Sequence, residues 1–161
     1  MSDGRHEVTI RGTPAEVWAF FWDGDALARV LPGCEAIRAD GPGLYAATIA
    51  IPAQFFTVRA DAVIEVQDPH PPRSAVITID GTPRGFGGAF HVRIPVRLGS
   101  VEDADGLVTR VHYGVDVRVE GALASMGPTV LRDAMVGRVK DLAANIEGEI
   151  RAGRDVGTAA P

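Results

Sequence analysis

The four histidines and the single cysteine are the side chains best suited to metal binding or nucleophilic catalysis. A metal site needs His, Cys or carboxylate ligands grouped at short, regular spacing. The histidines are instead scattered along the chain, as His6, His70, His91 and His112. His91 and His112 alternate with apolar residues and so fall on the polar side of two predicted strands. We therefore predict no metal site and no catalytic residue, and interpret these histidines as exposed.

Cys34 follows the turn residues Pro32 and Gly33 at the start of a predicted strand. A lone thiol becomes a nucleophile when a neighbouring base favours the thiolate. No sequence pattern places such a base beside Cys34, and the favoured interpretation is a small packing residue after a tight turn. A single cysteine also excludes an internal disulfide, which is typical of a reducing compartment.

Size and charge restrict the partners that the protein can have. A chain of 161 residues, 46% of them hydrophobic, suits one globular domain. The formal net charge of −5 argues against nucleic acid, because non-specific binding to phosphates needs clustered Lys and Arg. The N-terminus has no signal pattern, and the most apolar stretch, residues 46–56, is far shorter than the ~20 residues of a membrane span. We expect a cytoplasmic protein whose membrane contact, if any, is peripheral at the inner face.

One long amphipathic helix is predicted over residues 128–151. Its apolar residues recur at steps of three and four and so share one face: Leu131, Met135, Val139, Leu142, Ile146 and Ile150. Pro128 suits the first helical position, and Gly127 can end a preceding turn. This break also has a functional interpretation, in which residues 122–126 move as a lid over a pocket. A broad apolar face of this kind needs a partner surface.

The preceding sequence supplies that surface as strands with one apolar face each. Alternation predicts strands at 6–11, 34–39, 44–51, 56–67, 74–80, 90–98 and 110–120. Two short helices are predicted after the first strand, and the earlier one begins at a capping box formed by Thr13 and Glu16. Because no crossover helix separates the later strands, an antiparallel meander is favoured.

The predicted fold class is therefore α+β. A curved antiparallel sheet of about seven strands wraps around the long C-terminal helix, in a single domain over residues 1–152. Residues 153–161 are expected to form a disordered tail.

The apolar faces of sheet and helix would enclose either a filled core or a ligand cavity, and the pattern alone leaves both open. Ligand pockets are mostly apolar, methionine adapts to varied shapes, and Tyr113 offers one hydroxyl. The residues expected to line such a cavity are Phe56, Val58, Phe90, Val92, Tyr113, Val115, Met126, Val130, Leu131 and Met135. The cavity is expected beside the N-terminal third of the helix, whereas Leu142, Ile146 and Ile150 are expected to be ordinary core.

Four segments in order resemble one protein family: GTPAEVWAFFWD, LARVLPGCEAI, GPGLYAATIAI and YGVDVRVEGALASMGPTVLRDAM. They are similar to the family of CoxG, a subunit of carbon monoxide dehydrogenase, within the START and polyketide-cyclase-like helix-grip (SRPBCC) superfamily. The resemblance implies a helix-grip fold with an apolar cavity between sheet and helix. It also implies a non-catalytic accessory protein of a molybdenum hydroxylase, which helps to recruit that enzyme to the membrane and its quinones. No cofactor and no metal are implied.

Three hypotheses about function remain. In the first, the cavity binds a quinone-like or lipid-like molecule and the protein assists a carbon monoxide dehydrogenase-type enzyme. In the second, the core is filled and the outer surface docks on that enzyme. The third is a polyketide cyclase or aromatase, which would need polar groups that project inward. The inward positions offer Thr109 and Tyr113 but no carboxylate or histidine.

Overall fold

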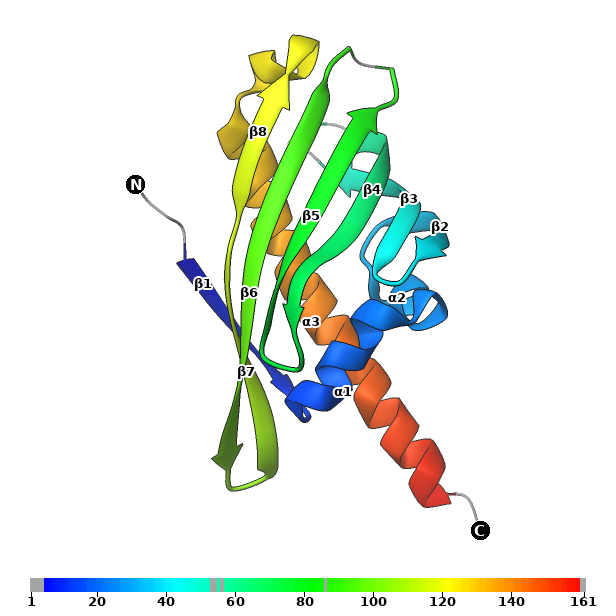
Figure 1. Ribbon diagram of the computed structural model, residues 1–161, viewed down its shortest axis with the longest axis vertical. Helices are drawn as coiled ribbons and strands as arrows, with labels where there is room; N and C mark the ends of the chain where they lie inside the picture. The colour runs from blue at the N-terminus through cyan, green and yellow to red at the C-terminus, as the bar shows by residue number, and fades with distance from the viewer. Residues whose placement is uncertain (1–4, 53–54, 56, 86, 160–161) are drawn as a thin grey trace.

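Eight strands form one antiparallel sheet that curves around the long C-terminal helix (Figure 1). The structure is a computed structural model, and it describes residues 5–52, 55, 57–85 and 87–159, with side chains except those of 126 and 154–159. The elements are β1 (Arg5–Arg11), α1 (Pro14–Ala19), the 3-10 helix η1 (Phe20–Trp22), α2 (Gly24–Val30), β2 (Cys34–Gly41), β3 (Leu44–Pro52), β4 (Thr57–His70), β5 (Ser74–Pro83), β6 (Ala89–Asp103), β7 (Gly106–Gly114), β8 (Asp116–Glu120), the 3-10 helix η2 (Gly121–Met126) and α3 (Pro128–Ala159). The predicted α+β fold is confirmed.

The strand order is β1-β7-β6-β5-β4-β3-β2, and β8 pairs with β6 beyond the end of β7. Strands β2 to β7 follow one another as the predicted meander. The first strand closes the order from the other end of the chain, because β1 pairs with β7 from Arg5 opposite Gly114 to Arg11 opposite Val108. The two edges of the sheet therefore lie on either side of α3 (Figure 1).

The predicted last strand, 110–120, is divided at Val115 into β7 and β8. The register against β6 is unchanged across the break, since Tyr113 pairs with Val96 and Asp116 pairs with Arg93. The interruption lies opposite Pro95, which has no N–H to donate to the ladder. Beyond it, β8 leads into η2 and then into the start of α3.

The early helices begin as the sequence predicts. The Thr13 hydroxyl accepts a hydrogen bond from the Glu16 amide at 3.1 Å, and the Glu16 carboxylate accepts one from the Thr13 amide at 2.9 Å. This capping box starts α1, and Asp23 caps α2 through the amides of Asp25 and Ala26. Together α1, η1 and α2 lie between β1 and β2 in the chain and pack beside α3 (Figure 1).

The turn from α2 into β2 explains part of the LPGC motif. Gly33 has a φ of 73°, and its carbonyl oxygen accepts a hydrogen bond of 2.8 Å from the amide of Ala50 in β3. A Cβ at this position would collide with the carbonyl oxygen of Ala50. Glycine is therefore required both for the left-handed conformation and for the close approach of the two backbones.

Helix α3 starts at Pro128, after Gly127 with a φ of 83°, as predicted. It continues through Ala159, past Arg151, so the range 153–161 begins within this helix. Its apolar face packs on the concave side of the sheet, where Met135, Ala143, Ile146 and Ile150 are buried. Among the described helices, none is both long and apolar enough to cross a membrane.

Candidate ligand-binding cavity

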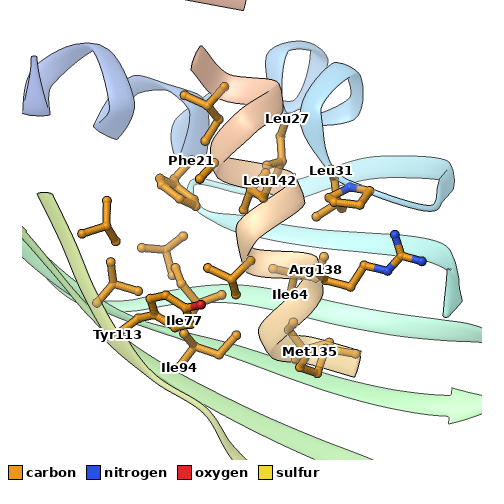
Figure 2. Close-up of a pocket in the computed structure, with 18 of the residues that line it drawn as sticks. Phe21, Leu27, Leu31, Ile64, Ile77, Ile94, Tyr113, Met135, Arg138 and Leu142 are labelled. Atoms are coloured by element: carbon orange, nitrogen blue, oxygen red, sulfur yellow. The ribbon is translucent and has the colours of Figure 1, made fainter. Parts of the chain in front are cut away.

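A cavity of about 120 Å³ lies between the concave face of the sheet and the middle of α3 (Figure 2). Alternate residues of the central strands form its floor, among them Ile64, Ile77 and Ile94. One helical face of α3 forms its roof, with Met135, Arg138, Val139, Leu142, Ala143 and Ile146. These roof residues are spaced by one, three or four positions, as expected for a single face.

The early helices close one side of this cavity. Val17 of α1, Phe21 of η1 and Leu27 of α2 contribute side chains to the lining, followed by Leu31 and Pro32. Figure 2 shows Phe21, Leu27 and Leu31 around the same turns of α3 as Leu142. The helical segment after β1 therefore acts as a wall that stands between the sheet and α3.

The predicted cavity residues are divided between two voids. Phe90, Tyr113 and Met135 line the large cavity. Val58, Val130 and Leu131, again with Phe90, line a second cavity of about 20 Å³ next to Gly127 and Leu123. Val92 and Val115 are buried but line neither cavity. Phe56 lies outside the described residues, and so does the side chain of Met126.

The predicted position of the pocket along α3 needs a correction. The large cavity lies beside the middle of the helix, so Leu142 and Ile146 line it instead of forming ordinary core. Ile150 is core, as predicted, and packs over Gly12. Only the small cavity lies beside the first turns of α3.

Several lining residues were missed although their pattern was visible. Ile64, Ile77 and Ile94 occupy inward positions of strands that the sequence predicts, and Leu142 and Ile146 belong to the predicted helical stripe. Inward parity could have identified them as candidates. It could not show which part of the apolar face lies over empty space, because that depends on the curvature of the sheet and on the helical wall.

Three polar side chains line the large cavity: Tyr45, Tyr113 and Arg138. The Tyr45 hydroxyl donates a hydrogen bond of 2.7 Å to the carbonyl oxygen of Phe21. The Tyr113 hydroxyl has no hydrogen-bond partner in the described part of the chain, although the residue is only 3% exposed. Burial raises the pKa of both phenols, with a further contribution from the Asp23 carboxylate at Tyr45, so both stay protonated.

Arg138 is the charged residue of the lining. Its side chain is 25% exposed, and its guanidinium lies 3.4 Å from the Asp141 carboxylate on the same helix. With Leu31 and Pro32, which are half-buried, it forms a partly exposed side of the lining that we call the mouth. Figure 2 shows the guanidinium of Arg138 directed away from the other lining side chains.

The histidines and Cys34 lie apart from the cavity. His91 bridges two strands on the outer face of the sheet, and its ring nitrogens lie 2.7 Å from Asp80 and 2.9 Å from Glu120. Among the described residues, no three His, Cys, Asp or Glu side chains are grouped so that they could hold a metal ion. The Cys34 thiol donates to the carbonyl oxygen of Ala36 at 3.5 Å, and burial raises its pKa, which disfavours the reactive thiolate.

Known structures share this arrangement. A conserved protein from Geobacillus kaustophilus superposes with a TM-score of 0.79 at 24% identity, over 94% of this chain and 96% of that one. A START superfamily protein from Mycobacterium smegmatis gives 0.57 at 15% identity, over 92% and 96%. The Zhui aromatase/cyclase from Streptomyces sp. R1128 gives 0.58 at 17% identity, over 92% of each chain. At these identities the likeness establishes the fold alone.

Sequence comparison identifies the family. No protein with a curated description matches the chain. The profile of the family of CoxG, a subunit of carbon monoxide dehydrogenase, matches residues 7–151, a range that contains the cavity and all the elements around it. The resemblance of the four sequence segments is thereby confirmed, and the chain belongs to the carbon monoxide dehydrogenase CoxG family.

Proposed function

We propose that this protein is a non-catalytic accessory protein that binds a hydrophobic small molecule in the large cavity. The observation that carries the proposal is an apolar void of about 120 Å³ beneath α3 in a member of the CoxG family. An unfilled cavity of this size costs on the order of 3 kcal/mol relative to a packed core. A cost of that size favours a void that is used over one that is incidental.

The chemistry of the lining points to the class of ligand. Apart from two tyrosines and Arg138, the described lining residues are aliphatic or aromatic, or Pro and Met. Such a surface favours a molecule with a large apolar body, whether quinone-like or lipid-like. Val58, Val130 and Leu131 would take part if ligand binding joined the small cavity to the large one.

The family name supplies the proposed setting. We place the protein with a carbon monoxide dehydrogenase-type molybdenum hydroxylase, which it would help to recruit to the membrane or the quinone pool. A carrier of apolar molecules suits that role, because the ligand would otherwise have to cross water between enzyme and membrane. The proposed location is cytoplasmic, with peripheral contact at the inner face of the membrane.

The enzyme alternative has less support in the lining. A cyclase or aromatase needs positioned groups for proton transfer, and such groups have pKa values near the working pH. The described lining offers two phenols with raised pKa values and one guanidinium at the mouth. These groups can orient or hold a ligand more readily than they can exchange protons with it.

Binding is tested with a quinone and a fatty acid as probes, by native mass spectrometry and by displacement of a fluorescent apolar dye. We expect at least one probe to bind in the micromolar range. Met135→Trp would fill part of the cavity and weaken binding, whereas Val63→Trp adds the same ring on the exposed outer face and would leave binding unchanged. The carrier proposal is wrong if neither probe binds, or if Met135→Trp and Val63→Trp behave alike.

The docking alternative is separated by a pulldown of the molybdenum hydroxylase. If the protein is only a docking module, Met135→Trp would capture the enzyme as well as the unchanged protein does, and no apolar probe would bind. If it is a carrier, the same variant would still capture the enzyme but would lose the ligand.

A further inference from the structure

Tyr113 presents a buried hydroxyl to the large cavity. The residue lies at an inward position of β7, is 3% exposed, and faces Val96 across the ladder with β6. Figure 2 shows its ring extending from the sheet, with the oxygen among the side chains that line the cavity. No described group accepts or donates a hydrogen bond at this oxygen.

A buried hydroxyl without a partner is rare in folded proteins and is strongly disfavoured. The other polar groups nearby are already paired, since Tyr45 donates to the Phe21 carbonyl oxygen and Thr109 donates to the Gly12 carbonyl oxygen at 2.9 Å. Arg138 is paired with Asp141 at the mouth. No polar side chain of the described lining is left to complete the hydrogen bonding of Tyr113.

Water is a poor candidate for this role. A buried water molecule typically needs two to four polar partners. Next to Tyr113 the described lining offers apolar side chains such as Ile77 and Ile94 (Figure 2). A water molecule there would gain one hydrogen bond and lose the others that it makes in bulk solvent.

We propose that Tyr113 is a specificity-determining residue of the cavity, whose hydroxyl donates a hydrogen bond to a neutral carbonyl oxygen on an otherwise apolar ligand. The inference rests on the proposed ligand-binding function and specifies the chemistry of the ligand. A carboxylate at the same place would be buried without a cation, because Arg138 is at the partly exposed mouth. A plain hydrocarbon would leave the hydroxyl unpaired.

The test uses two small probes of nearly the same shape. Acetophenone carries a ketone oxygen, and isopropylbenzene carries a methyl group in its place. Their affinities for the unchanged protein, Tyr113→Phe and Tyr45→Phe are measured by calorimetry or by dye displacement. Tyr45→Phe is the matched control, because the Tyr45 hydroxyl also borders the cavity but is already bonded to Phe21.

We expect Tyr113→Phe to weaken acetophenone binding about tenfold and to change isopropylbenzene binding less than twofold. Tyr45→Phe is expected to affect both probes equally. The carbonyl stretch of bound acetophenone should lie at lower wavenumber in the unchanged protein than in Tyr113→Phe, a shift that a purely structural role would not produce. Thermal unfolding should show Tyr113→Phe to be no less stable, since it removes an unpaired hydroxyl.

The outcomes separate the two proposals. If isopropylbenzene binds and Tyr113→Phe weakens both probes equally or neither, the role of Tyr113 is refuted while ligand binding stands. If neither probe binds to the unchanged protein, the carrier function and the role of Tyr113 both fail.

Discussion

Asn145 of α3 donates a hydrogen bond of 2.9 Å from Nδ2 to the carbonyl oxygen of Val30, the last residue of α2. The last carbonyl groups of a helix have no partner within it, and Val30 is fully buried. This contact joins residues 115 positions apart and fixes the helical wall of the cavity, with Leu27 and Leu31, against its roof.

Asn145→Ala is therefore expected to lower the free energy of unfolding by about 1–2 kcal/mol, because it leaves the Val30 carbonyl oxygen unsatisfied. Urea unfolding followed by circular dichroism measures the change. Ala144→Ser, at the exposed neighbouring position, is the control and should change stability by less than about 0.5 kcal/mol. Equal effects of the two substitutions would show that the hydrogen bond contributes nothing specific.

The cavity predicts that an alanine on its roof can be enlarged at little cost. Ala143 lines the cavity, whereas Ala60 of β4 is fully buried and lines neither cavity. Ala143→Leu should place its added carbons in empty space and keep the unfolding free energy within about 1 kcal/mol, while Ala60→Leu overpacks the core and loses about 1–3 kcal/mol. The comparison is made on ligand-free protein by urea unfolding. If Ala143→Leu is as destabilised as Ala60→Leu, the void is not available to side chains.

Local sequence signals predicted much of the fold because their causes are local. The capping box of Thr13 and Glu16 needs only four residues, and the alternation in β4 or β6 needs only one strand. The division of the last strand opposite Pro95 and the pairing of β1 with β7 depend on residues far apart in the chain. No pattern within one segment encodes them.

The cavity was predicted in kind but not in place. Inward parity identified Phe90, Tyr113 and Met135 correctly as inward residues, and it marked Leu142 and Ile146 as inward too. Which of these residues touch the void depends on how far the segment with Phe21 and Leu27 holds α3 from the sheet. That separation is a tertiary property, and it moved the site from the start of α3 to its middle.

The ion pairs of His91 predict a pH dependence of stability. Hydrogen bonding to Asp80, then the charge and hydrogen bond of Glu120, raise the pKa of His91 in the folded state despite some desolvation. Arg118 of β8 lies opposite His91 in the ladder and opposes the effect. The folded protein therefore binds this proton more tightly than the unfolded chain does. The resulting stabilisation is complete below the unfolded pKa of ~6.5 and is lost as pH rises through the higher folded value.

Urea unfolding of the unchanged protein and of His91→Gln between pH 5.5 and 8.5 tests this. The advantage of the unchanged protein should be largest at the acidic end and should shrink toward pH 8.5. An advantage that stays constant with pH would mean that the imidazole acts as a neutral hydrogen-bonding group. An NMR titration of His91 would locate its folded pKa directly.

Arg138 predicts a preference for anionic headgroups at the mouth, separate from the recognition of a neutral oxygen by Tyr113. The guanidinium is partly exposed and its contact with Asp141 is long, at 3.4 Å, so it can turn toward a ligand carboxylate. Arg138→Gln should weaken binding of octanoate about twofold to fivefold, as expected for a partly exposed charge pair, and should leave methyl octanoate unchanged. Arg132→Gln is the matched control, because Arg132 is on the same helix but does not line the cavity. Dye displacement measures all four affinities, and the effect on octanoate should diminish in high salt. An equal loss for octanoate and its ester would indicate that Arg138 acts through the packing of its alkyl chain and not through its charge.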